Sequence, residues 1–253
     1  WTGSGTFNQV YVDSGTLNVA STLDAPVNVA AGTTLGGYGT VTGAVTNNGT
    51  IAVANALPTL AGSGNGAFTI NGALTNAGLV QLGGAGVGNR LNVGSYVGQN
   101  GTLALNTYLG GDGSPSDQLV VNGGTATGST RLQINNVGGP GAETVANGIQ
   151  VVQAANGATT SPSAFMLAGP VKAGAYQYHL VHGGITPGTA DNWYLRNSVP
   201  SVDGVVDPPD PAIGTPPLPE PPPAGEDPIV TYRPEVPVYA ALPGVARQLG
   251  IQQ

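Results

Sequence analysis

Cysteine is absent from this 253-residue chain, which excludes a disulfide framework, an iron–sulfur cluster and a thiolate-bound zinc site. A large chain without cysteine suits export through an oxidising periplasm, because no premature disulfide can form there. Only 8% of the residues are charged, and the six basic side chains include a single lysine, Lys172. Contacts to nucleic-acid phosphates need clustered Lys and Arg, so we expect no nucleic-acid partner.

Long apolar runs are also missing. No stretch approaches the roughly 20 apolar residues that a helix needs to span a bilayer. The composition is not the Ala-, Glu-, Lys-, Leu- and Arg-rich one of coiled coils and helical bundles. Neither a signal peptide nor an initiator methionine opens the chain, which starts Trp1-Thr2-Gly3. We therefore expect a piece cut from a longer precursor.

Glycine and proline, by contrast, are abundant, and they divide the chain near residue 199. Of the 42 glycines, 37 lie in residues 1–198, whereas 14 of the 21 prolines lie after them. Residues 199–253 also hold seven of the 13 acidic side chains and two of the six basic ones. Proline has no backbone N–H, so the proline-rich part is not expected to join a sheet. We predict a stiff, acidic, proline-rich linker over residues 199–231, which leads into residues 232–253.

Residues 1–137 carry an internal repeat. Five short segments of strand character each begin at a glycine, and these glycines are separated by 17, 17, 29 and 23 residues. Apolar residues two apart, such as Leu17 and Val19, match the period of a strand, and no stretch has a helical apolar face longer than two turns. The five glycines are Gly15, Gly32, Gly49, Gly78 and Gly101.

Short strands at intervals of this length favour a solenoid. Sandwiches and barrels are built from antiparallel hairpins at intervals of roughly 8–12 residues. A solenoid instead adds one coil per repeat, each hydrogen-bonded to the next at ~4.8 Å. We predict an all-β fold, a single-stranded parallel β-helix whose Val, Leu and Ile side chains point inward. Insertions leave such a stack as loops, and we assign Leu57–Gly66 and Gly83–Gly88 to them.

The open end of a β-helix needs a cap, because its unpaired edge strand could otherwise pair with other chains. We assign the C-terminal cap to residues 138–198. Within it, Ala175–His182 alternates in strand fashion, Asn192–Arg196 forms a second aromatic strand, and glycine and proline turns lie between them. These strands predict an antiparallel hairpin that closes the helix end. Its aromatic side chains, which bury large areas, are Tyr176, Tyr178, Trp193 and Tyr194.

Three sequence blocks, which together cover roughly residues 100–243, carry a resemblance to a known family. They are Gly110–Val121 continuing into Thr130–Gly139, then Tyr176–Leu180 with Trp193–Arg196, and finally Tyr232–Val236 after the linker. By their order and spacing, the chain resembles the C-terminal part of the passenger of monomeric Gram-negative autotransporters of the pertactin-like kind.

The resemblance implies a right-handed β-helix at the bacterial cell surface, tethered to the outer membrane or released from it. It also implies that roughly residues 100–198 form the autochaperone region, which in that family folds first outside the cell and templates the rest of the helix. The family continues after the linker into a translocator β-barrel, which would be this chain's own partner. The sequence ends at Gln253 before such a barrel, so we expect a monomeric fragment that does not itself insert into a membrane.

Residues able to carry chemistry are few. His179 and His182 are the only histidines, and their spacing on a strand points them to opposite faces, so we expect neither a shared metal ion nor a proton relay. Asp112 and Asp117 are the best candidates for a catalytic carboxylate pair. No cation lies near them in sequence to bind an acidic sugar, so we assign both to hydrogen bonds with turn backbone.

Two glycine-rich tracts imitate ligand-binding motifs. Gly123–Gly128 lacks the helix and the acidic partner of a dinucleotide loop. Gly110–Gly113 approaches a calcium-binding repeat once, without the repetition that a calcium site of that kind needs. We therefore predict no catalytic, cofactor-binding or metal site.

These observations favour a non-enzymatic structural module, the stem and autochaperone end of a passenger that promotes passenger folding during secretion across the outer membrane. Two alternatives stay open. One is an adhesin that binds a host protein or a glycan through side loops such as Leu57–Gly66. The other is a β-helix enzyme acting on a polysaccharide, which would need a carboxylate cluster on one face.

Overall fold

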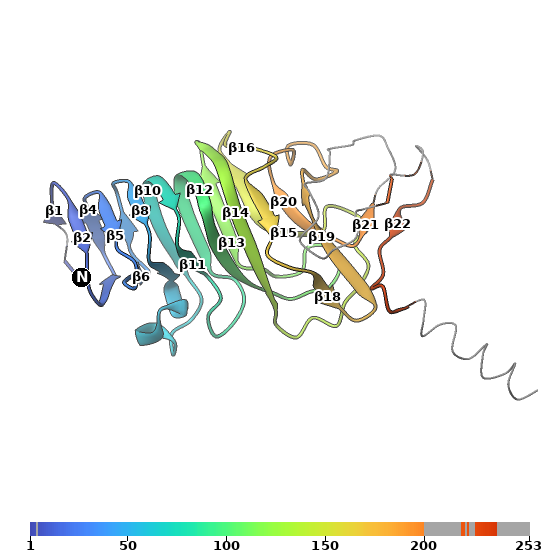
Figure 1. Cartoon of the computed structure of the whole chain (residues 1–253), viewed down its shortest axis with the longest axis horizontal. Helices are drawn as coiled ribbons and strands as arrows, with labels where there is room; N and C mark the ends of the chain where they lie inside the picture. Colours follow the sequence, from blue (N-terminus) through green and yellow to red (C-terminus); the bar gives the residue numbers. More distant parts are fainter. Residues whose placement is uncertain (4, 200–218, 221, 223–225, 237–253) are drawn as a thin grey trace, which may run out of the picture.

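The computed structural model of the chain describes residues 1–3, 5–199, 219–220, 222 and 226–236. Short strands stack along the long axis of the molecule, from N-terminal coils at one end to a cap at the other (Figure 1). Twenty strands join one sheet, and the pairings between successive coils are parallel. The predicted parallel β-helix is confirmed, and its right-handed sense stays a prediction.

Each coil contributes strands to three faces, and every face is a parallel ladder. The first face contains β1 (Gly5–Thr6), β4 (Thr22–Asp24), β7 (Thr40–Val41), the start of β10 (Ala67–Asn76), the start of β12 (Arg90–Thr107), β13 (Gln118–Asn122) and β15 (Ile149–Ala155). The second contains β2 (Val10–Val12), β5 (Val27–Val29), β8 (Val45–Asn47), the end of β10, the middle of β12, the start of β14 (Thr125–Asn136) and β16 (Thr159–Thr160). The third contains β3 (Thr16–Val19), β6 (Thr34–Gly37), β9 (Thr50–Val53), β11 (Leu79–Gln81), the ends of β12 and β14, and β17 (Phe165–Leu167).

The five glycine-led segments of the predicted repeat all lie on the third face. One apolar residue from each coil sits in register with the next, so their side chains stack into the interior. All are buried except the first, which is partly buried. The stack is Leu17, Leu35, Ile51, Val80, Leu103, Leu132 and Leu167. The repeat seen in the sequence is therefore the interior of the coil.

A short polar ladder runs through the same interior. The Asn47 amide donates to the Asn76 side-chain oxygen (2.8 Å), and the Asn76 amide donates to the Tyr96 hydroxyl (3.0 Å). The Tyr96 hydroxyl also lies 3.0 Å from that of Thr130. All four side chains are fully buried. Because each coil satisfies polar atoms of the next, the ladder fixes which coil stacks on which.

The predicted insertion Leu57–Gly66 leaves the stack, as expected. It begins among two short 3₁₀ helices, η1 (Ala54–Ala56) and η2 (Pro58–Leu60), which project from the coils in Figure 1. Leu57 is nevertheless fully buried, and the Tyr38 hydroxyl donates to the carbonyl of Gly64 (2.5 Å). The insertion is thus held against the coil at both its start and its tip.

Parallel pairing continues beyond residue 137, through β15, β16 and β17. After Leu167 the pairing becomes antiparallel. Strand β18 (Val171–Ala173) pairs with β19 (Tyr176–His182), β19 pairs with β20 (Trp193–Arg196), and β20 returns onto β15. The predicted hairpin is confirmed, whereas the division of coils and cap at residue 137 stays a prediction.

The described part of the C-terminal segment returns to the cap. Strand β21 (Ser198–Val199) pairs with β22 (Ile229–Val230), and Tyr232 forms a bridge with Tyr176. The sequence did not indicate this return, and most of the proline-rich stretch lies outside the described residues. Within the parts of the chain that the structure describes, no helix has the length and apolarity needed to cross a membrane.

Candidate functional site

The cap is built around a chain of buried aromatic rings. The Trp193 indole lies edge-on to Phe165, with ring centroids 5.3 Å apart, and Phe165 lies 5.7 Å from Tyr96. All three side chains are at most 1% exposed. The rings come from β20, β17 and β12, so they join the antiparallel hairpin to two parallel coils. Aromatic burial of this extent makes the cap one packed unit with the last coils.

Thr160 lies beside this aromatic cluster and connects three partners. Its hydroxyl donates to the carbonyl of Asp191 (2.7 Å) and accepts from the indole N–H of Trp193 (2.9 Å). His182 Nε2 lies 2.9 Å from the same oxygen. Since the only hydroxyl proton of Thr160 is directed at Asp191, His182 must donate from Nε2. Its Nδ1 atom is then an acceptor, and it is buried without a partner.

Both predicted structural histidines are buried, at 6% exposure each. Burial lowers the pKa of His179 to about 4. Burial also lowers the pKa of His182, partly offset by the negative charge of Asp191. Both imidazoles are therefore neutral at pH 7. No group of three or more metal-ligating side chains occurs among the described residues.

Asp112 holds a loop of the cap through backbone N–H groups. One carboxylate oxygen accepts from Val145 (2.7 Å) and Ala146 (3.0 Å), and the other accepts from Gly148 (2.6 Å). Gly148 has φ +90°, and a Cβ there would lie 2.4 Å from the carbonyl oxygen of Leu195, so only glycine fits. The contact brings residues more than 30 positions apart in sequence together.

Asp117 also accepts hydrogen bonds from backbone N–H groups, those of Gly88 and Asn89 and that of Asn106. Its Oδ1 accepts from the N–H groups of Gly88 (2.7 Å) and Asn89 (2.8 Å), and its Oδ2 accepts from the N–H of Asn106 (2.8 Å). The residue is fully buried. Burial raises the pKa of Asp117, and the three N–H donors act against that rise.

The prediction that the two carboxylates accept hydrogen bonds from the backbone is therefore right, but most of the N–H groups that they bind lie outside the turn to which both were assigned. Asp112 bonds N–H groups more than 30 positions away in sequence. Asp117 bonds the distant Gly88 and Asn89, and also Asn106 at the base of its own loop. Each carboxylate holds a different set of segments, and all four oxygens accept backbone hydrogen bonds. Sequence spacing could not reveal the distant partners, Gly88 and Asn89 for Asp117 and Val145, Ala146 and Gly148 for Asp112, because these segments meet the carboxylates only in the folded chain.

Of the four predicted cap aromatics, Tyr178 and Trp193 are fully buried and Tyr194 is 4% exposed. The Tyr178 hydroxyl accepts from the N–H of Ala142 (3.0 Å) and donates to the carbonyl of Gly110 (2.8 Å). Tyr176 is partly buried and stacks on Tyr232. Two further members of the aromatic cluster, Tyr96 and Phe165, carried no sequence signal that distinguished them from ordinary core residues.

A polar hollow of about 250 Å³ lies on the third face of the coil. It is bordered by four carboxamide side chains and by small residues, and none of the residues that line it is charged. Its lining is Gln81, Gly83, Gly84, Ala104, Leu105, Asn106, Gln133 and Asn135. Carboxamides of this kind donate to and accept from hydroxyl groups of a neutral ligand.

One known family matches part of this chain. Residues 75–180 match the family model described as Autochaperone Domain Type 1. The matched range runs from the end of β10 to the middle of β19. It includes both carboxylate contacts and two of the three rings of the aromatic cluster.

Several curated relatives are similar over parts of the chain. Adhesin BmaC autotransporter of Brucella suis biovar 1 (strain 1330) is 32% identical over 284 residues, covering 95% of this chain and 8% of the relative. Uncharacterized protein YdeU of Escherichia coli (strain K12) is 41% identical over 165 residues, covering 64% of this chain and 32% of the relative. Autotransporter adhesin AIDA-I of Escherichia coli is 34% identical over 117 residues, covering 46% of this chain and 9% of the relative.

The chain thus spans from under a tenth to about a third of the length of these relatives. Autotransporter relatives imply a location at the cell surface or outside the cell, associated with the outer membrane, and a separate translocator domain. The match over residues 75–180 and these relatives together make this chain a passenger region of an autotransporter that carries a type 1 autochaperone domain.

Proposed function

We propose that this chain is a non-enzymatic stem and autochaperone region that promotes folding of the passenger to which it belongs. The observation that carries the proposal is the cap itself, in which buried rings join the hairpin to the coils and the Asp112 carboxylate holds a cap loop. The first coils have a core of Val, Leu and Ala, without a buried aromatic ring. The cap buries the large rings of Phe165, Tyr178 and Trp193, and burial of large rings favours its early formation.

Once the cap has folded, it favours the folding of the next coil onto it, and each folded coil favours the one after it. In a parallel β-helix, the strands of one coil offer N–H and C=O groups to the next, so a new coil gains both backbone bonds and a packed interior when it adds. We propose residues 1–137 as coils, 138–198 as the cap and roughly 100–198 as the autochaperone region. The partner of the whole passenger would be its own translocator, with this region a monomer at the cell surface or released from it.

Replacement of Trp193 tests the proposal. We expect Trp193→Ala to lower the free energy of unfolding by about 3–5 kcal/mol and to slow refolding from denaturant, because the ring joins hairpin and coils. The matched control is Tyr11→Ala, since Tyr11 is 64% exposed in an N-terminal coil. Stopped-flow refolding of the full chain measures both effects. A wild-type refolding rate with lowered stability would mean that the cap packs late, against an autochaperone role.

A second candidate function is adhesion. Two of the relatives are named adhesins, and the uncharged carboxamide hollow of the third face has the chemistry to bind a neutral glycan. A glycan array with the full chain tests it, comparing Gln133→Ala in the hollow with Gln99→Ala, which is exposed outside it. Binding that Gln133→Ala leaves unchanged would remove the hollow as the site.

A further inference from the structure

The cap has an edge that is covered by the chain's own C-terminal segment. We propose that this edge is a peptide-binding surface and that its ligand is the segment Ile229–Glu235, which we call the strap. The strap lies along β19 and β21, and Figure 1 shows β22 beside β21 at the end of the molecule. The proposal is independent of the autochaperone role, because it concerns only which peptide the cap edge holds.

The strap is held first by its backbone. The Gln177 N–H donates to the carbonyl of Thr231 (3.1 Å), and the Thr231 N–H donates to the carbonyl of Asn197 (2.7 Å). The Thr231 hydroxyl lies 2.8 Å from the Gln177 carbonyl oxygen and 3.0 Å from that of Asn197. Two residues further on, the Arg233 N–H donates to the carbonyl of Ala175 (2.9 Å). Thr231 is thus inserted between two segments of the cap, as in peptide recognition by strand addition.

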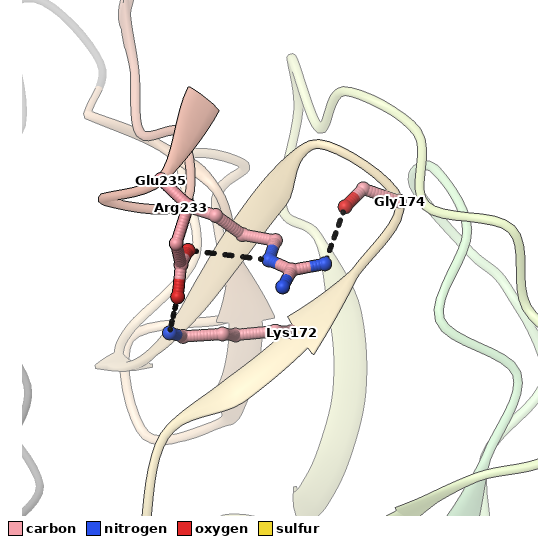
Figure 2. A network of polar contacts seen from close by, with 4 residues as sticks. All are labelled: Lys172, Gly174, Arg233 and Glu235. Carbon is pink, nitrogen blue, oxygen red and sulfur yellow. Dashed lines mark hydrogen bonds and ion pairs between the residues drawn. The ribbon is translucent and has the colours of Figure 1, made fainter. Parts of the chain in front are cut away.

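Side chains give the surface its selectivity. Tyr232 stacks on Tyr176, with ring centroids 5.5 Å apart and an angle of 27° between the ring planes. Figure 2 shows the ionic part, in which Glu235 lies 3.3 Å from Lys172 and 3.5 Å from the Arg233 guanidinium. The same guanidinium donates to the carbonyl of Gly174 (3.2 Å). The peptide that fits must therefore offer, in order, a threonine, an aromatic ring, an arginine and a carboxylate.

The side-chain contacts of the strap lie at the surface, unlike those inside the cap. Tyr232 is 51% exposed, and the side chains of Lys172 and Glu235 are 30% and 44% exposed. Exposed stacking and ion pairs are individually weak, so the strap can open without unfolding the core. Opening would free the paired edges of β19 and β21 and would lengthen the tether between the cap and residues 237–253.

Hydrogen exchange on the full chain tests whether the strap is docked. We expect the amides of Gln177, Thr231 and Arg233 to be protected, and Tyr232→Ala to speed their exchange at least tenfold. The amide of Leu103, deep in the coil, should keep its rate in every variant and so reports on global folding. Exchange of the three amides at the rate of a free peptide in the unsubstituted chain would overturn the proposal.

The ion pair has a matched control in the same segment. Glu235→Gln removes the partner of Lys172 and Arg233 and should speed exchange of the Arg233 amide several-fold, an effect that 1 M salt reproduces in the wild type. Glu226→Gln changes an exposed glutamate just before the strap and should leave exchange unaltered. If the Arg233 amide exchanged at the same rate in Glu235→Gln and Glu226→Gln, the ion pair would have no part in holding the strap on the cap.

A peptide added in trans tests the surface directly. The full-chain Tyr232→Ala variant, whose own strap is weakened, should bind a synthetic peptide of residues 226–236 at least tenfold more tightly than the wild type, whose surface is occupied. The same peptide carrying Tyr232→Ala should bind neither protein. Equal binding of the peptide to both proteins, or no binding to the variant, would overturn the proposal.

Discussion

Thr160, Asp112 and Asp117 each hold together parts of the chain that lie far apart in sequence. The hydroxyl of Thr160 joins β16 to Trp193 and to the carbonyl of Asp191. The carboxylates of Asp112 and Asp117 accept three backbone N–H groups each. The contacts of Thr160 and Asp117 are buried, and they are a main source of specificity because leaving a buried polar group unpaired costs about 1–3 kcal/mol.

Burial of His179 predicts how the stability of the cap responds to acid. His179 has its pKa lowered to about 4 by burial, against about 6.5 in an unfolded chain. Above pH 6.5 both states are neutral at this residue and the stability does not change. As the pH falls from 6.5 toward 4, the unfolded state binds a proton that the native state does not. The native state therefore loses up to about 3 kcal/mol, of which about 2 kcal/mol is lost by pH 5.

Chemical denaturation at pH 7.5 and pH 5 measures this loss. The lowered pKa of His182 acts in the same direction, and the raised pKa of Asp117 acts in the opposite one. A His179→Gln variant isolates the contribution, because it should lose less stability between the two pH values than the wild type. Identical losses in both proteins would show that His179 stays accessible to protons in the folded cap.

Aromatic residues were partly predictable. Strand period in Ala175–His182 predicts that Tyr176, Tyr178 and Leu180 share one inward face; Tyr178 and Leu180 are buried, and Tyr176 is partly buried. The same rule left Gln177 and His179 on the outer face, yet they are only 3% and 6% exposed. At least part of the reason is the strap, whose Thr231 lies against Gln177. A period-2 pattern indicates one buried face and cannot tell that a later segment covers the other.

The loops of the coil carry long-range ties in addition to those of the strands. The loop Gly83–Gly88 was predicted as an insertion, and its last residue donates its N–H to Asp117. Asn89, directly after it, donates its amide to the carbonyl of Leu82 (2.7 Å), which closes the base of the loop. The insertion therefore leaves the stack without loosening it.

Replacing Asp117 by asparagine tests this tie. Asp117→Asn keeps the shape of the side chain, but its amide group turns one acceptor into a donor that faces backbone N–H groups. We expect the free energy of unfolding to fall by about 2–4 kcal/mol. Asp13→Asn is the control, since Asp13 is exposed. Denaturant melts of both variants measure the difference, and an equal, small effect would mean that the loop does not need the carboxylate.

Across the whole molecule, the core changes from one end to the other. Near the N-terminus it is made of Val, Leu and Ala, whereas buried aromatic side chains begin with Phe68 and Tyr96 in the middle coils and continue into the cap with Phe165, Tyr178 and Trp193. Each coil contacts mainly its neighbours, so local stability follows local packing. Charge is also distributed unevenly along the chain. Residues 1–198 carry six acidic and four basic side chains, whereas residues 199–253 carry seven acidic and two basic ones.

This gradient predicts the order of opening. Amides of the first coils, such as that of Val27, should exchange faster in native-state hydrogen exchange than amides of β12 and β14, because the first coils have a core of smaller side chains without a buried aromatic ring. Low concentrations of denaturant should widen the difference. One exchange rate common to all core amides would show that the molecule opens only as a whole.

The sequence by itself determined the class of the fold and its repeat. Apolar residues two apart, recurring after a glycine, can bury their side chains only by stacking, and the register of Leu35, Ile51, Val80 and Leu103 follows. Tertiary structure alone decided which distant groups meet: Asp117 with Gly88, Trp193 with Phe165, and Thr231 with Gln177. The reason is that a strand pattern fixes the face on which a side chain lies, whereas its partner depends on how many residues each coil takes to return.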